Sequence, residues 1–128
     1  MFDYLRDGEE IYRRSFATVR AEADLGGLPG DMAAVAVRLV HACGMPDIVA
    51  DLRFSAGAPG AGRRALAAGA PVLADAEMVA AGIISKRLPA ANRVICTLGE
   101  VGPPEPGCTR SAAAVEMWRP HLSGAVVA

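Results

Sequence analysis

The sequence lacks the features that mark several classes of protein. Its 128 residues carry a formal net charge of −1, so it lacks the basic excess needed to bind nucleic acid phosphates. No apolar run approaches the roughly 20 residues of a membrane-spanning helix. The acidic opening stretch MFDYLRDGEE has no apolar core of the kind found in signal peptides. These absences predict a cytoplasmic protein that acts neither on nucleic acid nor in a membrane.

Cysteine and aromatic residues are also scarce. The three cysteines, Cys43, Cys96 and Cys108, form no C-x-x-C pair, which indicates reduced thiols rather than a disulfide framework or a zinc site. Aromatic residues make up only 5% of the chain. The core must therefore be built from Ala, Val, Leu and Ile, and its stability must depend on close packing of small side chains.

Two helices are predicted in the first part of the chain. Asp7 is a suitable N-cap for a helix that runs to about Asp24. Its apolar stripe comprises Tyr12, Ser15, Phe16, Val19 and Ala23. After the helix-breaking stretch GGLPG, Asp31 is expected to cap a second helix that ends at Gly44.

The rest of the chain alternates short helices with apolar strands. A helical turn and an extended piece are predicted over 45–55, and loops over 57–62 and 99–107. Helices are predicted over 61–69, 76–83 and 109–118, and strands within 71–75, 92–98 and 123–128. This alternation predicts an α/β protein with three layers, a largely parallel sheet flanked by helices. A strand can end a chain at a sheet edge, but an apolar final strand favours a domain that is incomplete at its C-terminus.

The second predicted helix carries a histidine on an unexpected face. If Met32 marks the centre of the apolar stripe, His41 lies on the opposite side, together with Ala34, Val37 and Arg38. That side is also largely apolar, so another element, a partner subunit or a ligand should cover it. The partial negative charge of the last helical turn favours a proton-donating imidazole, which suits general acid catalysis. A structural histidine bonded to the backbone is the alternative.

Cys43 lies on the predicted apolar stripe of this helix, so we expect it to pack in the core. A zinc site made by His41 and Cys43 is not expected, because residues two apart on a helix point in different directions.

Four stretches, in order along the chain, resemble the precorrin-8X methylmutase family, the corrin-ring isomerases of vitamin B12 biosynthesis. They are IYRRSFATVRAEADL, VAVRLVHACGM, APVLADAEMVAAGI and NRVICTL. The resemblance implies an isomerase that moves a methyl group from C11 to C12 of the tetrapyrrole macrocycle. The product would be hydrogenobyrinate from precorrin-8X, or cobyrinate from the cobalt-containing substrate.

The same resemblance implies further properties. It implies no organic cofactor, no metal site in the protein, and a homodimer with its active site near the subunit interface. His41 matches the family's catalytic acid, which is thought to protonate the macrocycle. Members of the family are longer, so residues 1–128 are expected to be a single methylmutase domain without roughly its last third.

Candidate substrate-binding residues include several hydroxyls and arginines, because the substrate carries acetate and propionate carboxylates. Ser15 matches a family serine near the substrate, although a buried hydroxyl bonded to backbone is an equal alternative. Thr109, Arg110 and Ser111 open a helix whose free N–H groups suit an anion. The alternative there is an ordinary cap beside a solvated arginine.

Other candidates come from strand ends and helix surfaces. Asp75 and Met78 follow a predicted strand, and ligands of open α/β sheets bind at the carboxyl ends of strands. Asp75 could equally serve only as the N-cap of the next helix. Thr97 ends the second predicted strand and could line the same crevice, while Arg14 and Arg38 could meet substrate carboxylates.

Two alternatives to an active isomerase stay open on the sequence. One is a protein that binds corrins without turning them over, and the other is an inactive fragment of the enzyme.

Overall fold

The computed structural model describes residues 4–128, and the chain forms two compact units, residues 1–59 and 60–128. No helix among the described residues has the length and apolar character needed to cross a bilayer.

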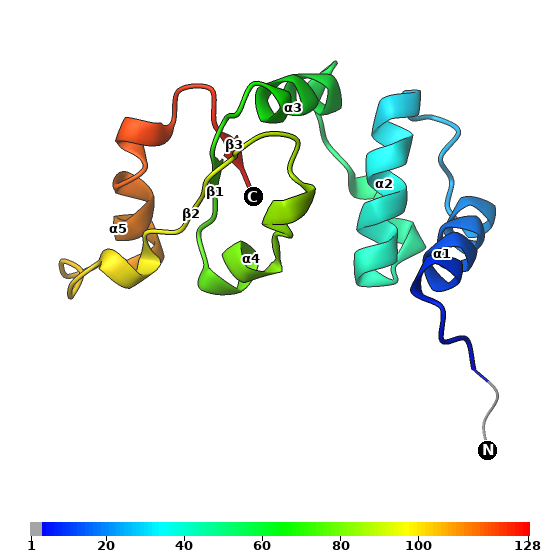
Figure 1. Cartoon of the computed structure of the whole chain (residues 1–128), viewed down its shortest axis with the longest axis horizontal. Helices are drawn as coiled ribbons and strands as arrows, with labels where there is room; N and C mark the ends of the chain where they lie inside the picture. Colours follow the sequence, from blue (N-terminus) through cyan, green and yellow to red (C-terminus); the bar gives the residue numbers. More distant parts are fainter. Residues whose placement is uncertain (1–3) are drawn as a thin grey trace. The chain divides into compact units, whose positions relative to one another are not determined.

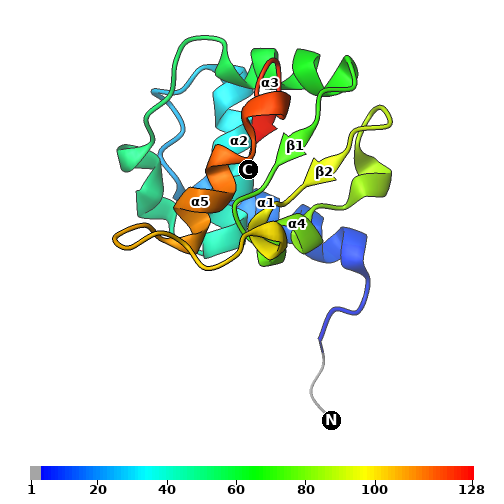
Figure 2. The ribbon, with the colours of Figure 1, turned by 90° about the vertical axis from the view of Figure 1, so that its left-hand side faces the viewer.

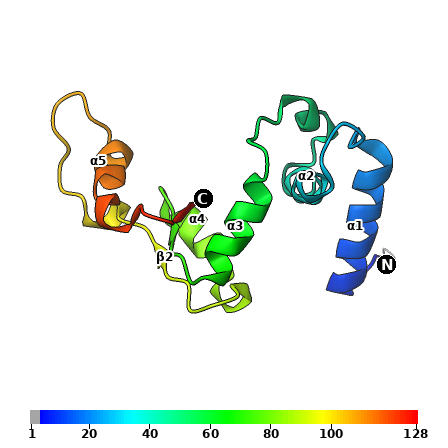
Figure 3. The same cartoon turned by 90° about the horizontal axis from the view of Figure 1, so that it is seen from above.

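The first unit is built from two helices and a short turn. Helix α1 spans Gly8–Glu22, α2 spans Gly30–Cys43, and the 3₁₀ helix η1 spans Pro46–Asp51. Figure 1 shows α1 in blue beside α2 in cyan. In Figure 3, α2 is seen nearly end-on while α1 is seen along its length, so the two helices cross steeply.

The start of α1 follows from a side-chain cap. The carboxylate of Asp7 accepts a hydrogen bond from the backbone N–H of Glu10 at 3.0 Å, which satisfies one of the donors left free in a first helical turn. The predicted N-cap is thereby confirmed. The helix gives way to extended backbone at Ala23, close to the predicted end.

Helix α2 ends as predicted but begins differently. Gly44 adopts a left-handed conformation with φ 70° and donates its N–H to the carbonyl of Val40, the termination for which glycine is favoured. The N-cap is Pro29, which bears no capping side chain. The prediction that Asp31 caps this helix is wrong, because Asp31 already lies in its first turn and accepts from the N–H of Met32.

The core of the first unit consists of small side chains from three elements. The buried members are Val19 and Ala23 near the end of α1, Ala36, Val37 and Val40 of α2, and Val49 of η1. Phe16, Leu25 and Leu28 are among the partly buried side chains packed against them. This confirms the expectation that a chain poor in aromatic residues builds its core from Ala, Val, Leu and Ile.

The buried face of α2 differs from the predicted stripe. Val37, expected on the far side with His41, is only 2% exposed, whereas Leu39 is 39% exposed and Cys43 is also exposed. The expectation that Cys43 packs in the core is therefore wrong. The physical reason is that α1 packs against the Val37 side of α2, which shifts the buried arc toward His41.

The second unit contains a small parallel sheet. Strand β1 spans Val72–Leu73, β2 spans Val94–Ile95 and β3 spans Val126–Val127. The strand order is β2-β1-β3, and both neighbours pair with β1 in parallel. Figure 2 shows β1 and β2 side by side. The prediction of an α/β fold with a parallel sheet is confirmed, and Leu73 and Ala74 are fully buried, as expected for the central strand.

Short helices precede the first strand and connect the three strands. They are α3 (Ala58–Ala67), α4 (Glu77–Gly82), α5 (Arg110–Glu116) and the 3₁₀ helices η2 (Ser85–Arg87), η3 (Leu98–Glu100) and η4 (Arg119–His121). The prediction of a loop over 57–62 is wrong, because α3 already begins at Ala58. Its Pro59 lies in the first turn, where a helix tolerates proline. The N-cap at Thr109 is confirmed, since its hydroxyl accepts from the N–H of Ala112.

A buried asparagine ties the second unit together. The side-chain amide of Asn92 donates to the carbonyls of Leu66 and Ala70 at 2.8 Å each, and its oxygen accepts from the N–H of Ala90. It thereby connects the end of α3 to the residues that precede β2. Asn92 is 8% exposed, so these backbone groups would find little water in its absence.

Val40→Ala tests the core of the first unit. We expect it to lower the free energy of unfolding by about 2 kcal/mol, because two buried methyl groups are lost and a cavity remains. The matched control is Leu39→Ala, the neighbouring and exposed side chain of α2, which should cost under about 1 kcal/mol. Urea denaturation followed by circular dichroism measures both, and equal losses would contradict the described burial.

Asn92→Ala tests the second unit. Three buried backbone groups would lose their partner, so we expect a loss of about 3 kcal/mol of stability. The exposed Ser85→Ala should change it by less than about 0.5 kcal/mol. A change of similar size in both variants, measured by the same denaturation, would show that Asn92 does not link these segments.

Candidate functional site

The site in the first unit centres on a hydrogen bond between α1 and α2. The hydroxyl oxygen of Ser15 lies 2.7 Å from Nδ1 of His41. Both side chains are half-buried. His41 borders the buried arc of α2, so it faces α1 and not the side away from the core. Three covers were open for this side of α2, namely another element, a partner subunit or a ligand, and the structure shows α1 there.

Two aromatic rings of α1 enclose the imidazole. The ring of Tyr12 lies 5.0 Å from that of His41 in a tilted arrangement, and the ring of Phe16 lies 5.1 Å away, edge to face. Tyr12 and Phe16 also contact each other, with ring centroids 5.8 Å apart. Ser15 and Phe16 are neighbours in the sequence and lie one helical turn after Tyr12, so the three side chains hold the imidazole from several directions.

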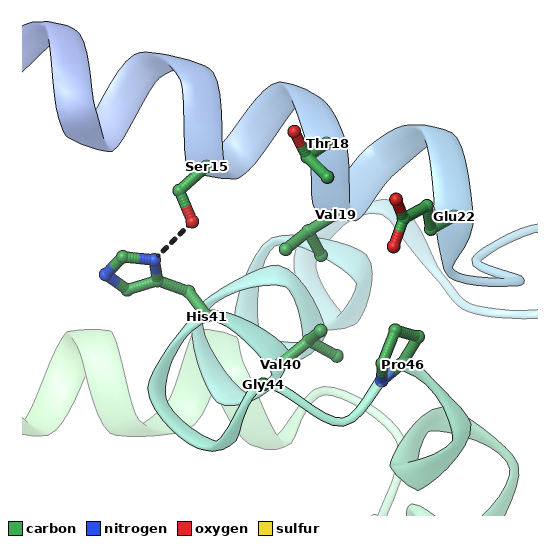
Figure 4. A pocket seen from close by; sticks show the side chains of 8 residues that line it. All are labelled: Ser15, Thr18, Val19, Glu22, Val40, His41, Gly44 and Pro46. Atoms are coloured by element: carbon green, nitrogen blue, oxygen red, sulfur yellow. Dashed lines mark hydrogen bonds between the residues drawn. The ribbon is translucent and has the colours of Figure 1, made fainter. Parts of the chain in front are cut away.

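A groove runs beside the imidazole, along the crossing of the two helices. Figure 4 shows it with its lining residues, which are Ser15, Thr18, Val19, Glu22, Val40, His41, Gly44 and Pro46. Its volume is about 270 Å³, slightly less than that of common ligand pockets, which start near 300 Å³. A large macrocycle therefore does not fit within it.

The other ring nitrogen of His41 points away from this groove. In Figure 4, Nε2 is directed toward the N-terminal half of α1, on the side opposite Thr18 and Glu22. Among residues 4–128, Ser15 is the hydrogen-bonding side chain of this imidazole. Nε2 is thus available for proton exchange with a bound molecule.

A serine next to a histidine also suggests a nucleophile and its base, but the surroundings do not fit that chemistry. Ser15 lies in the middle of α1, where backbone N–H groups are engaged in the helix and cannot stabilise an oxyanion. Within the described residues, no carboxylate is hydrogen-bonded to the imidazole to orient it as a base. The arrangement is better suited to proton transfer by His41 itself.

The part of the chain that the structure describes contains no cluster of metal ligands. No three side chains of His, Cys, Asp or Glu gather there in a way that could hold a metal ion.

The two arginines predicted in the first unit have different surroundings. Arg14 is exposed and its Nε donates to the carboxylate of Glu10 at 2.7 Å, while Arg13 binds the same carboxylate. Hydrogen bonds from Arg13 and then Arg14 lower the pKa of Glu10 to about 2. Arg38 instead lies over the ring of Phe16, 5.5 Å from its centroid. Of the two, Arg38 is the one adjacent to the cluster that His41 forms with Ser15, Tyr12 and Phe16, the His41 cluster.

The candidates at the strand ends lie in the second unit. Thr97 follows β2, is 5% exposed, and donates its hydroxyl to the carbonyl of Ala114 in α5, so it anchors a helix. Asp75 is exposed after β1, and the prediction that it caps α4 is wrong, because the N-cap is Ala76. Met78 of α4 is 83% exposed.

At the start of α5, the three predicted residues remain near the surface. Arg110 donates one N–H of its guanidinium to the carbonyl of Leu98 at 3.0 Å. Its other N–H groups take no part in that bond. Thr109 and Ser111 are exposed. Ser15 and His41, with Arg38 nearby, are therefore the candidates that the first unit brings together, while the other six described here belong to the second unit.

Sequence reasoning missed four residues at the site. Tyr12 and Phe16 were assigned only to an apolar stripe, and Thr18 and Glu22 to no function. The signal was present, because Tyr12, Thr18 and Glu22 lie three, three and seven residues from Ser15, on neighbouring turns of the same helix face.

Comparisons with known proteins agree on one family. The family profile CbiC, precorrin-8X methylmutase, matches residues 10–128. A precorrin-8X methylmutase of Pseudomonas aeruginosa is 63% identical over 99% of this chain, and one of Sinorhizobium sp. is 52% identical over the same share. The chain spans 63% and 62% of the length of these relatives.

Solved structures support the same assignment. The precorrin-8X methylmutase of Thermus thermophilus is 35% identical with a TM-score of 0.76, and it covers 94% of this chain and 61% of its own. A protein described as related to precorrin-8X methylmutase is 30% identical with a TM-score of 0.71, over 88% of this chain and 60% of its own. Since the family profile matches nearly the whole sequence and the fold agrees, this chain belongs to the precorrin-8X methylmutase family.

Proposed function

We propose that this chain acts in cobalamin biosynthesis as an isomerase that moves a methyl group from C11 to C12 of precorrin-8X, giving hydrogenobyrinate. The cobalt-containing substrate would give cobyrinate. The proposal rests on family membership and on one observation above the others. The imidazole of His41 is fixed through Nδ1 and leaves Nε2 available for proton transfer.

The chemistry of the reaction matches what such a site supplies. A methyl shift around a conjugated ring needs no nucleophile, since the carbon framework rearranges within itself. It needs a positioned proton donor that changes the electron distribution of the macrocycle, and a pocket complementary to the rearranged ring. In this proposal His41 is the general acid, with the imidazolium as its active form.

The remaining site residues are proposed as contacts to the substrate. Its carboxylates would pair with Arg38 beside the His41 cluster and with Arg110, Thr109 and Ser111 at the start of α5. Ser15 in the first unit, and Asp75, Met78 and Thr97 in the second, are proposed as further contacts to the substrate. Arg14 would first have to leave Glu10 and Thr97 would have to leave Ala114, so each of these two contacts requires an existing bond to break.

Family membership also supports a proposal about the location, oligomeric state and cofactor use of the protein. We propose a cytoplasmic homodimer that uses no organic cofactor and holds no metal ion of its own. Residues 1–128 would form a single methylmutase domain. Sedimentation equilibrium of the purified chain tests the dimer directly.

His41→Gln is the decisive variant for catalysis. Removing the general acid should lower turnover of precorrin-8X by at least about 100-fold, because glutamine keeps a polar side chain but cannot donate a proton from a cation. His121→Gln, at the only other histidine, serves as the matched control and should keep wild-type turnover. The formation of hydrogenobyrinate is followed by its visible absorption.

A binding titration separates the alternatives. Hydrogenobyrinate should produce a saturable spectral shift with the wild-type chain and an altered one with His41→Gln. Equal turnover by the wild type and His41→Gln would remove the acid role of His41. A saturable shift without any turnover would replace the enzyme by a corrin-binding protein.

A further inference from the structure

We infer that Ser15 is a positioning residue, whose hydroxyl holds Nδ1 of His41 so that Nε2 both gives the proton and takes it back. This inference deepens the proposed function and rests on it for its catalytic meaning. Its structural content, the protonation pattern of one imidazole, is measurable without turnover.

The geometry of the contact supports a positioning role. The Oγ–Nδ1 distance is 2.7 Å, and it joins residues 26 positions apart on two different helices. Both partners lie within regular helix, Ser15 in the middle of α1 and His41 in the last turn of α2. A short side chain on a rigid element has few rotamers, so this contact fixes the imidazole more firmly than a flexible loop could.

The aromatic neighbours restrict the ring further. Tyr12 and Phe16 lie within 5.0 and 5.1 Å of the imidazole centroid, from the same helix as Ser15. These rings restrict the rotation of the imidazole that would exchange its two nitrogens. The hydrogen bond therefore decides which nitrogen faces outward.

The proton inventory then follows from the donors and acceptors. A protonated imidazole carries a hydrogen on each nitrogen, so Nδ1–H donates to Oγ of Ser15 while Nε2–H stays available. During transfer, the Nε2–H bond breaks and its electron pair stays on nitrogen. An electron pair of the macrocycle forms the new bond to hydrogen. The neutral imidazole keeps its hydrogen on Nδ1, still bonded to Ser15.

The return of the proton uses the same nitrogen. An isomerisation has no net gain of protons, so the macrocycle must lose one after the methyl group has moved. The lone pair on Nε2 accepts it and the imidazolium is restored. Without the Ser15 oxygen accepting from Nδ1–H, the neutral ring could carry its hydrogen on Nε2 instead. That form can neither give a proton readily nor accept one at the outward position.

The orientation also places the reacting part of the substrate. Nε2 points toward the N-terminal half of α1 and away from Thr18 and Glu22. The atom that receives the proton should therefore lie near the ring of Tyr12, a residue that is 49% exposed. The groove on the opposite side, which ends at the carboxylate of Glu22, would repel the acidic side groups of the substrate.

Nitrogen NMR of the imidazole tests the inference directly. The chain has two histidines, so His121→Gln leaves His41 as the single imidazole and assigns its signals. In ¹⁵N-labelled protein, at a pH where the ring is neutral, we expect hydrogen on Nδ1 and a lone pair on Nε2. Ser15→Ala should shift the population toward hydrogen on Nε2, the form that predominates for free histidine in water.

Two further variants serve as controls. Ser15→Thr keeps a hydroxyl at the same position and should preserve hydrogen on Nδ1. Thr18→Ala removes a hydroxyl one turn further along the same groove and should leave the tautomer unchanged, because that hydroxyl has no bond to the imidazole. Alanine is the best helix former, so Ser15→Ala should fold.

Each outcome is informative. A wild-type ring with its hydrogen mainly on Nε2, or a tautomer that Ser15→Ala does not change, would overturn the inference. If turnover is detected, Ser15→Ala should lower it about tenfold, the factor expected for one lost hydrogen bond, with hydrogenobyrinate binding retained. Absence of turnover in the wild type would count against the proposed function alone, since the NMR result is independent of it.

Discussion

The close approach of α1 and α2 is the constraint on which the candidate site depends. Ala36 is fully buried at 0% exposure and Val40 at 2%, so the helices meet through small side chains. The hydroxyl of serine extends only one bond beyond Cβ, and it reaches the imidazole at 2.7 Å because the backbones are near each other. A larger side chain at position 36 would separate the helices and open the Ser15–His41 contact. The same small residues thus stabilise the unit and set the geometry of its chemistry.

Because aromatic residues are scarce in this chain, the positions of the few that are present are informative. Three Phe, two Tyr and one Trp occur in the chain, and two of these rings contact His41. The core of the first unit needs only one of the two, since Phe16 packs against it while Tyr12 remains 49% exposed. A stiff ring at the surface suits contact with a flat ligand. The ring of Tyr12 also limits rotation of the imidazole. One side chain can therefore both contact a ligand and orient His41.

In the second unit, several polar side chains near the strands form hydrogen bonds to the backbone. Asn92 and Thr97 flank β2 on either side and are buried. Asn92 donates to the carbonyl of Leu66, and Thr97 donates to the carbonyl of Ala114. Such bonds offset the cost of burying polar groups within a small sheet. Arg110 donates one of its N–H groups to the carbonyl of Leu98. The groups left facing outward, such as Asp75 and Ser111, are those a ligand could reach without breaking an existing bond.

The sequence by itself determined most element types and the parallel sheet, and it marked His41 as the candidate catalytic acid. Local signals sufficed there, because caps such as Asp7 and Thr109, the terminating Gly44 and the apolar runs act over a few residues. Tertiary structure alone decided which side of α2 is buried, since every side of that helix carries apolar residues and only the placement of α1 selects one. It also decided that Ser15 meets Nδ1 of His41, because a contact between residues 26 apart depends on how two helices cross. Helical periodicity fixes the faces of each helix, but packing between helices fixes which faces meet.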